Sequence, residues 1–145
     1  MINLNRLDEA LLESDPTNYE LRADISFKAG KFEQALEYID KEAAQHHTGK
    51  HVEERANILI KLKRFKEAYD VIESENPDKL DFENRWDLPS LLFLRAQAHL
   101  GLDDRDHAIE DLRKAIPMFY RQAEIKSRDS AQKLIDTIIA APSKK

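Results

Sequence analysis

Three histidines near the middle of the chain come closest, in residue type and spacing, to a metal site. His47 and His51 are four positions apart, which on a single helix would place both imidazoles on one face. Gly49 lies between them at an expected turn, however, and no acid within the short segment from His46 to His51 completes a ligand set. We therefore expect a solvated linker here and no metal site.

Carboxylates are abundant, but nothing in the sequence selects a catalytic pair among them. With 28 Asp and Glu residues, some pairs on helical surfaces reach suitable separations by coincidence. Only three glycines are available for a phosphate-binding loop, no serine or histidine setting indicates an activated nucleophile, and the absence of cysteine excludes thiolate chemistry and disulfides. The sequence predicts no catalytic residues, no cofactor and no enzymatic activity.

The elements that must position any site recur along the chain. In the stretch from Arg22 to Asp40, Ala23 and Ala35 stand twelve positions apart with Gly30 between them, and apolar residues recur at helical spacing on both sides. The same spacing returns after 33 residues at Ala56 and Ala68 and after a further 40 at Ala96 and Ala108. This self-similarity indicates an array of helix pairs.

The residue types at these places fit two helices joined by a tight turn. Alanine lets two helix axes approach to about 8–10 Å, and glycine adopts a left-handed conformation at little cost. Lys63 takes the place of Gly30 in the second copy, so that turn either uses a residue less suited to positive φ or has another geometry. Phe32 and Phe65 follow the first two turns, whereas Arg105 follows the third.

These patterns predict the organisation of the chain. We expect one domain over residues 1–140, with a cap helix at 4–13, repeats at about 16–48, 49–80 and 88–117, a C-terminal capping helix at about 129–140 and a disordered tail at 141–145. The cap helix would point Leu4, Leu7, Leu11 and Leu12 inward. Pro117 is expected to end or kink its helix, ahead of a polar break at 126–129.

An insertion between the second and third copies explains the change of period from 33 to 40 and contains the only tryptophan. Insertions in repeat arrays map to loops on one face and can contribute to binding. The alternative, which we prefer, is that Trp86 fills the space beneath the longer loop.

Charge is distributed unevenly along the chain. The net charge is −5, yet residues 112–145 carry eight bases against three acids. This basic end either meets an acidic partner or is one of two differently charged solvated surfaces. The acidic remainder disfavours nucleic-acid binding, and the absence of a secretory h-region or a membrane-length apolar run leads us to expect a cytoplasmic protein that does not associate with membranes.

The repeated residues resemble the tetratricopeptide repeat (TPR) family over roughly residues 16–117. The matching positions are Ala23, Gly30, Phe32 and Ala35 in the first copy, Ala56, Phe65 and Ala68 in the second, and Ala96 and Ala108 in the third. Arg22, Arg55 and Arg95 stand where the family usually has leucine. An arginine there can lay its stem on the core and turn its head to water or a carboxylate, so we expect structural ion pairs.

The resemblance implies an all-α fold, a right-handed superhelix of antiparallel helix pairs known as an α-solenoid. It also implies a concave groove, lined by the first helix of each pair, that binds a peptide or partner helix. The implied groove residues are Glu20, Asp24, Phe27, Lys28, Lys50, Glu53, Asn57, Ile60, Lys61, Phe93, Gln97 and Leu100.

The same comparison indicates what the groove would bind. Chaperone-binding members of the family hold a C-terminal carboxylate, but Glu20 and Asp24 occupy the first two clamp places and would repel one. An apolar or amphipathic segment with some basic residues fits better, which suggests an adaptor, a scaffold or an auxiliary subunit. The alternatives are a self-associating subunit that uses Ile138 and Ile139, or an enzyme with a site near Glu20, Asp24 and Glu53.

Overall fold

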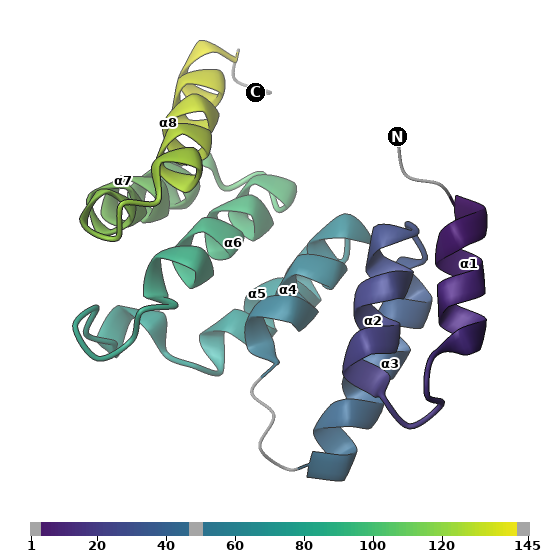
Figure 1. The fold of residues 1–145 in the computed structure, drawn as a ribbon. Helices are drawn as coiled ribbons and strands as arrows, with labels where there is room; N and C mark the ends of the chain where they lie inside the picture. The colour runs from purple at the N-terminus through teal and green to yellow at the C-terminus, as the bar shows by residue number, and fades with distance from the viewer. Residues whose placement is uncertain (1–3, 47–50, 142–145) are drawn as a thin grey trace. The chain divides into compact units, whose positions relative to one another are not determined.

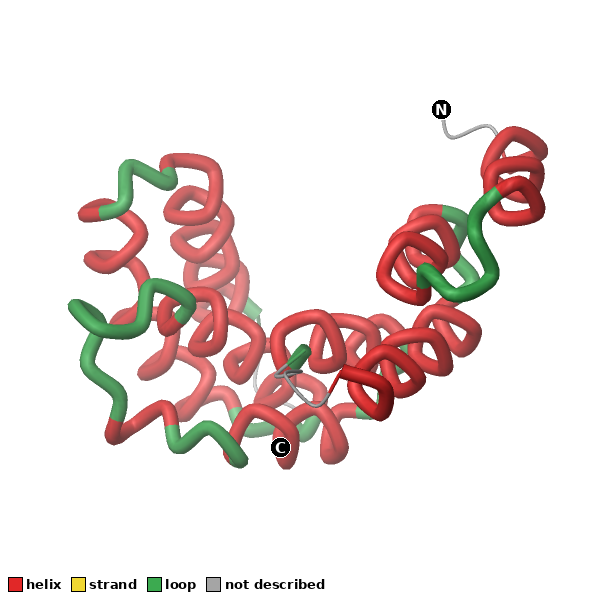
Figure 2. Tube along the Cα trace, turned by 60° about the horizontal axis from the view of Figure 1, so that its bottom comes forward, coloured by secondary structure: helices red, strands yellow, loops and turns green. Residues whose placement is uncertain are grey.

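The computed structural model describes residues 4–46 and 51–141, and within these ranges the chain forms eight α-helices, one short 3-10 helix and no strand. Figure 2 shows only helices and their connecting loops. The elements are α1 (Leu4–Glu13), α2 (Tyr19–Lys28), α3 (Phe32–His46), α4 (Val52–Lys61), α5 (Phe65–Glu73), η1 (Pro77–Lys79), α6 (Leu88–Gly101), α7 (Arg105–Arg121) and α8 (Ile125–Ala140). The all-α prediction is therefore confirmed.

The helices form two compact units, residues 1–64 and 65–145. Within each unit, helices that follow one another in the sequence pack against each other, as expected of a TPR-like α-solenoid (Figure 1). The boundary between the units falls in the turn between α4 and α5. A single domain and a superhelical path over all repeats stay predictions.

Four helix ends share one turn geometry. Gly30, Lys63, Asp103 and Ala123 all have positive φ, between 59° and 77°. In each turn the next amide donates to the carbonyl five residues before it, which is the Schellman arrangement. These bonds are Lys31 to Ser26 and Arg64 to Leu59, each 2.8 Å, Asp104 to His99 at 2.8 Å, and Glu124 to Phe119 at 2.9 Å. Lys63 thus adopts the left-handed conformation of Gly30.

The core of unit 1 lies where α2, α3 and α4 meet. Its fully buried members are Ala23, Ala35, Ile39 and Ile58. The two alanines are 4% and 0% exposed, which confirms that they are packing residues at a close approach of helices. On α1, the prediction that Leu12 points inward is wrong, because this side chain is 84% exposed.

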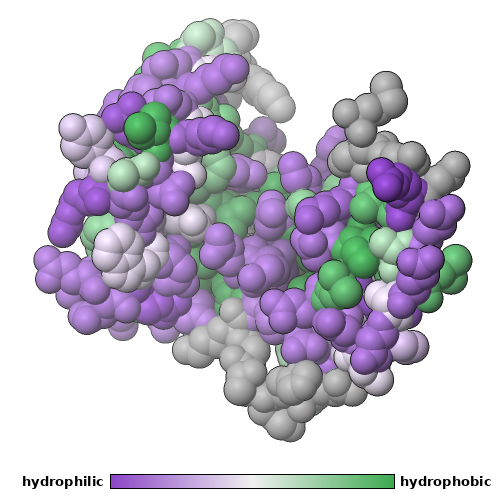
Figure 3. Space-filling view, viewed as in Figure 1, coloured by the Kyte–Doolittle hydropathy of each residue, from purple (hydrophilic) through white to green (hydrophobic). Residues whose placement is uncertain are grey.

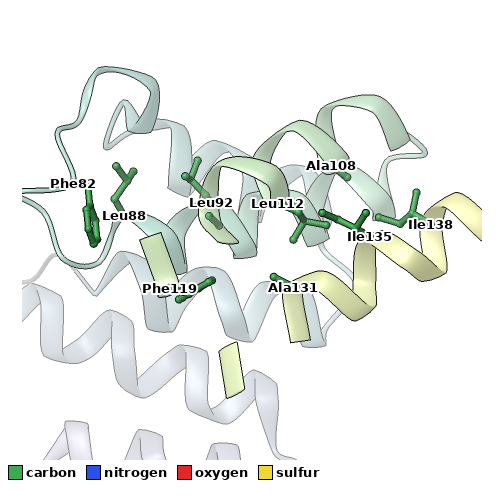
Figure 4. Packing of buried hydrophobic residues seen from close by; sticks show 11 residues of the cluster. Phe82, Leu88, Leu92, Ala108, Leu112, Phe119, Ala131, Ile135 and Ile138 are labelled. Atoms are coloured by element: carbon green, nitrogen blue, oxygen red, sulfur yellow. The ribbon is translucent and has the colours of Figure 1, made fainter. Parts of the chain in front are cut away.

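The core of unit 2 runs from the insertion to the last helix (Figure 4). Ala96 and Ala108 are fully buried, and α8 adds Ala131, Ile135 and Ile138. This last helix begins at Ile125, so the polar residues 126–129 form its first turn, and the predicted break is wrong. The apolar stripe of α8 covers the end of the unit 2 core.

Trp86 does not fill the space beneath the insertion. Its side chain is 65% exposed, whereas Phe82 is only 8% exposed and belongs to the unit 2 core. The two rings lie against each other, with centroids 5.5 Å apart. A phenyl ring has no polar atom to satisfy, so Phe82 takes the buried place and Trp86 lies over it.

Helix α7 does not end at Pro117, which corrects one part of the prediction for this residue. The helix continues to Arg121, and Pro117 lies on its exposed side. Proline removes the amide that would bond the carbonyl four residues earlier. The buried Ala115 and Phe119 on either side hold the following turn against the core.

Arg105 has a packing role of its own at the first position of α7, where Phe32 and Phe65 stand in α3 and α5. Its guanidinium donates to the backbone carbonyl oxygens of Ile138 and, at 2.9 Å, of Ala141. These carbonyls end α8 and lack partners within that helix. Arg105, which stands where the first two copies have phenylalanine, therefore holds the end of α8 against α7 through hydrogen bonds.

Candidate functional site

A cavity of about 600 Å³ opens in unit 1, lined mainly by α2 and α4. Hydrophobic residues are visible among hydrophilic ones over the α2 region (Figure 3). The lining residues are Asn18, Glu20, Leu21, Ala23, Asp24, Phe27, Ile39, His51, Glu54, Asn57 and Ile58. We call this cavity the α2–α4 groove.

Helical spacing places the groove residues on common faces. On α2, Glu20, Asp24 and Phe27 follow the spacing i, i+4, i+7, and on α4, Glu54 and Ile58 follow the spacing i, i+4. The start of α2 is fixed by the side chain of Asn18, which accepts a hydrogen bond from the amide of Leu21 at 3.1 Å. The groove is therefore built on two regular helices, of which α2 has a side-chain N-cap.

The floor of the α2–α4 groove is apolar. Ile39 and Ile58 are 4% and 3% exposed, so only a small part of each is open to the cavity. Phe27 is half-buried, and its ring stands edge-on to Phe32 with centroids 5.3 Å apart. Such a floor gains free energy by covering an apolar side chain, about 25 cal/mol for each Å² removed from water.

The rim is acidic. Glu20, Asp24 and Glu54 are exposed carboxylates, and Asp24 pairs with Lys28 at 2.9 Å. His51 Nδ1 lies 3.9 Å from Glu54 Oε2. Both pairs involve exposed carboxylates, and such pairs contribute about 0–1 kcal/mol, so an incoming cation can displace them.

The structure gathers four of the predicted groove residues in this cavity, namely Glu20, Asp24, Phe27 and Asn57. Four others lie on α2 or α4 but outside the lining: Lys28, Glu53, Ile60 and Lys61. Of these, Ile60 is partly buried and the three charged residues are exposed. Lys50 lies outside the described residues.

The remaining predicted residues belong to unit 2. Phe93, Gln97 and Leu100 share one face of α6 and are each partly buried. Phe93 stands edge-on to Phe119 with centroids 6.4 Å apart, and both Phe93 and Leu100 pack against the unit 2 core. Their part in binding stays a prediction.

Sequence reasoning missed several groove residues, among them Leu21, His51 and Glu54. The second repeat was expected to begin its first helix at about His51, and His51 is the N-cap residue of α4, with a side chain that is 22% exposed. The signal was present in the spacing, because Glu54 precedes Asn57 by three positions and Ile58 by four, and so lies on the same face.

The arginines at the family's leucine places hold helices together. Arg55 pairs with Asp40 at 2.6 Å, and Arg95 pairs with Glu73 at 2.8 Å. Asp40 and Glu73 occupy corresponding positions, 33 residues apart, so each arginine reaches back to the preceding helix at the same register. The expected structural ion pairs are confirmed at these two positions.

Arg22 departs from that expectation. Its guanidinium donates to the backbone carbonyls of Ser14 and Asp15, at 3.0 and 3.2 Å, and not to a carboxylate. These carbonyls follow the last turn of α1. Arg22 thus ties the cap helix to α2 in the way that Arg105 ties down α8.

Within residues 4–46 and 51–141, no group of three or more potential ligands is arranged to hold a metal ion. His47, one of the three histidines considered for a metal site, lies outside these ranges, as does most of the predicted tail (142–145). No helix in the described part of the chain combines the length and apolarity needed to cross a membrane.

Comparison with known proteins gives one family. Residues 89–117, which cover nearly all of α6 and α7 as far as Pro117, match a family model described as tetratricopeptide repeat. A search of curated proteins finds no significant match to the chain.

Proposed function

We propose that this TPR-like repeat protein is a non-enzymatic interaction module that binds a peptide or partner helix in the α2–α4 groove. It would serve as an adaptor, a scaffold or an auxiliary subunit in the cytoplasm. The observation that carries the proposal is the cavity of about 600 Å³ whose apolar floor is bordered by three exposed carboxylates. The family match to residues 89–117 supports an interaction role for the repeats.

The lining indicates the chemistry of the partner. An apolar side chain would cover Phe27 and the exposed parts of Ile39 and Ile58, while a nearby Lys or Arg would meet the carboxylates of Glu20 and Asp24. The amide of Asn57 can donate to and accept from a peptide backbone. The partner is therefore an apolar or amphipathic segment with basic residues.

The acidic rim argues against a free carboxylate as the anchoring group. Glu20 and Asp24 occupy the places where chaperone-binding relatives of the family carry their clamp, and both are exposed at the groove. A C-terminal carboxylate would be repelled by them. Recognition of an internal, basic segment follows as the better fit.

Peptides selected from a random display library against the full chain would test this proposal. We expect the selected peptides to combine a large apolar residue with Lys or Arg. The double substitution Asp24→Lys with Glu54→Lys should weaken their binding about tenfold, by charge repulsion at the rim. Glu37→Lys, a single charge reversal at an exposed position on α3 outside the lining, is the control.

Two results would count against the groove. One is selection of acidic peptides, and the other is equal affinity for the double variant and the Glu37→Lys control. Circular dichroism of each variant would show whether the helices are retained.

Self-association through α8 is a second candidate function, but it needs a correction. Ile138 is 4% exposed and belongs to the unit 2 core, so it is not available to a second copy. Ile125 and Ile139 are 60% and 59% exposed on α8, and these are the residues that favour the idea. Analytical ultracentrifugation at high micromolar concentration decides it, because a monomer alone would exclude self-association.

A further inference from the structure

A second cavity, of about 440 Å³, lies in unit 2 among α5, α6 and α7 and shares no lining residue with the α2–α4 groove. Arg95, 4% exposed, is one of its lining residues. Every N–H of this guanidinium is already used, because it donates to Asp111, Asp78 and Glu73 at distances of 2.7 to 3.2 Å. Arg95 is thus a fixed part of the wall.

The wall carries an excess of negative charge. Five carboxylates line the cavity, those of Glu73, Asp78, Asp104, Glu110 and Asp111. The permanent cations among the lining residues are Arg95 and Lys114, so three carboxylates are in excess while His107, which lies 2.6 Å from Asp104, is neutral. Partial enclosure by protein strengthens the field of such an excess compared with an open surface.

One buried polar side chain in this wall has no hydrogen-bond partner among the described residues. His99 is 9% exposed and lines the cavity. Its Nδ1 is 3.7 Å from Asp104 Oδ2 and its Nε2 is 3.6 Å from Asp111 Oδ2, both too long for a direct hydrogen bond. Its ring stacks on His107 with centroids 5.3 Å apart.

The charge state of His99 suits an acceptor. Burial is the largest influence on its pKa and holds it below the usual range, so the imidazole is neutral at neutral pH. A neutral imidazole offers one nitrogen lone pair. A donor placed between this ring and Asp104 or Asp111 would give the imidazole a hydrogen bond that it lacks among the described residues.

We infer that this cavity binds an organic cation, a guanidinium or alkylammonium group, that donates to the carboxylates of Asp104 and Glu110 and to the open nitrogen of His99. Such a group matches both the charge excess and the unfilled hydrogen-bonding position. Two sources share this chemistry, namely an arginine or lysine side chain of a partner segment and a free polyamine.

The test uses the full chain and two probes that differ in charge. N-acetyl-arginine amide should produce saturable amide shifts at Arg95, Asp104 and Asp111 in a two-dimensional NMR titration, while the uncharged N-acetyl-citrulline amide should not. Spermidine forms a separate arm. Tighter binding of spermidine indicates a free polyamine, and tighter binding of the arginine amide indicates a side chain; either result supports a cation site.

Substitutions then assign the site. Asp104→Asn keeps a good N-cap residue for α7 while removing the charge, and combined with Glu110→Gln it should weaken arginine-amide binding about fivefold. Asp106→Asn, an exposed change on the same helix outside the lining, is the control and should leave binding unchanged. Equal binding of citrulline and arginine amides, no saturable shift with any probe, or equal weakening by the control would overturn the inference.

Discussion

Arg95 and Asp111 form a two-point ion pair inside unit 2, with the guanidinium Nε and Nη2 each 2.8 Å from a carboxylate oxygen of Asp111. Both side chains are 5% exposed. The pair joins α6 to α7, and Glu73 and Asp78 extend it to α5 and η1. Arg95 thus links α6 to three other elements through carboxylates.

This pair predicts different costs for two arginines in equivalent places. Arg95→Met would leave Asp111 buried without its cation and should lower the free energy of unfolding by about 3–5 kcal/mol. Arg55→Met removes a pair whose acid, Asp40, is 57% exposed, and should cost about 0–1 kcal/mol for that interaction. Urea unfolding of both variants measures the difference, and similar losses would show that the buried pair has no special weight.

The Phe65 ring leaves no room for a side chain at Gly101. A Cβ built on Gly101 would come within 2.2 Å of the Phe65 ring. Gly101→Ala should therefore destabilise the protein by about 1–3 kcal/mol, although alanine normally favours a helix. Thermal unfolding measures this, and the double variant with Phe65→Leu should recover part of the loss. A stabilised Gly101→Ala variant would contradict the packing.

At Ser26, in contrast to Gly101, substitution by alanine is expected not to destabilise the protein. It is fully buried, and its hydroxyl has no hydrogen-bond partner among the described residues. Ser26→Ala should be neutral or raise the free energy of unfolding by up to about 1 kcal/mol, because it removes an unsatisfied polar group. Asn18→Ala, which removes the N-cap bond of α2, should instead cost about 1 kcal/mol. A loss of more than 1 kcal/mol for Ser26→Ala would mean that the hydroxyl is bonded.

The two stacked histidines should titrate in a fixed order. The hydrogen bond to Asp104 raises the pKa of His107, whereas burial lowers the pKa of His99. On acidification His107 therefore gains its proton first, and nitrogen-detected NMR of the imidazoles measures the order. Simultaneous protonation, or protonation of His99 first, would contradict the geometry.

The pKa shifts of His107 and His99 also determine how each histidine changes the free energy of unfolding with pH. The contribution of His107 is fully present below its unfolded pKa of about 6.5 and is lost as pH rises through the higher folded value. His99 acts in reverse, because the unfolded chain takes up its proton more readily, so its contribution falls as pH drops below about 6.5. His107→Gln should steepen the loss of stability on acidification, and His99→Gln should reduce it.

The fold could be predicted from the sequence because its signals are local and repeated. The alanine spacing recurs in three copies, and each copy describes one helix pair. The last helix was also expected, since Ile135 and Ile138 follow helical spacing. Its start was misplaced because polar residues in a first turn look the same in sequence as a loop.

The groove could be predicted only in part. Glu20, Asp24 and Phe27 follow from the face of one helix, but the cavity also needs Ile39 from α3 and Leu21, whose neighbours depend on tertiary packing. The prediction that Trp86 is buried beneath the insertion fails for a similar reason. The insertion contains two aromatic residues, Phe82 and Trp86, and the sequence does not show which of the two side chains is buried. The Arg95 cluster joins residues up to 38 positions apart, from Glu73 to Asp111, and the repeat spacing links only Glu73 to the arginine.

The binding site of a display-selected peptide, mapped by amide chemical shifts on the isotope-labelled full chain, tests the central proposal most directly. We predict that the largest shifts fall on α2 and α4, at Asp24, Phe27, Glu54 and Asn57. In the double variant Asp24→Lys with Glu54→Lys, about tenfold more peptide should be needed to produce the same shifts at Phe27 and Asn57. Shifts confined to other helices, or unchanged shifts in the double variant, would contradict binding in the α2–α4 groove.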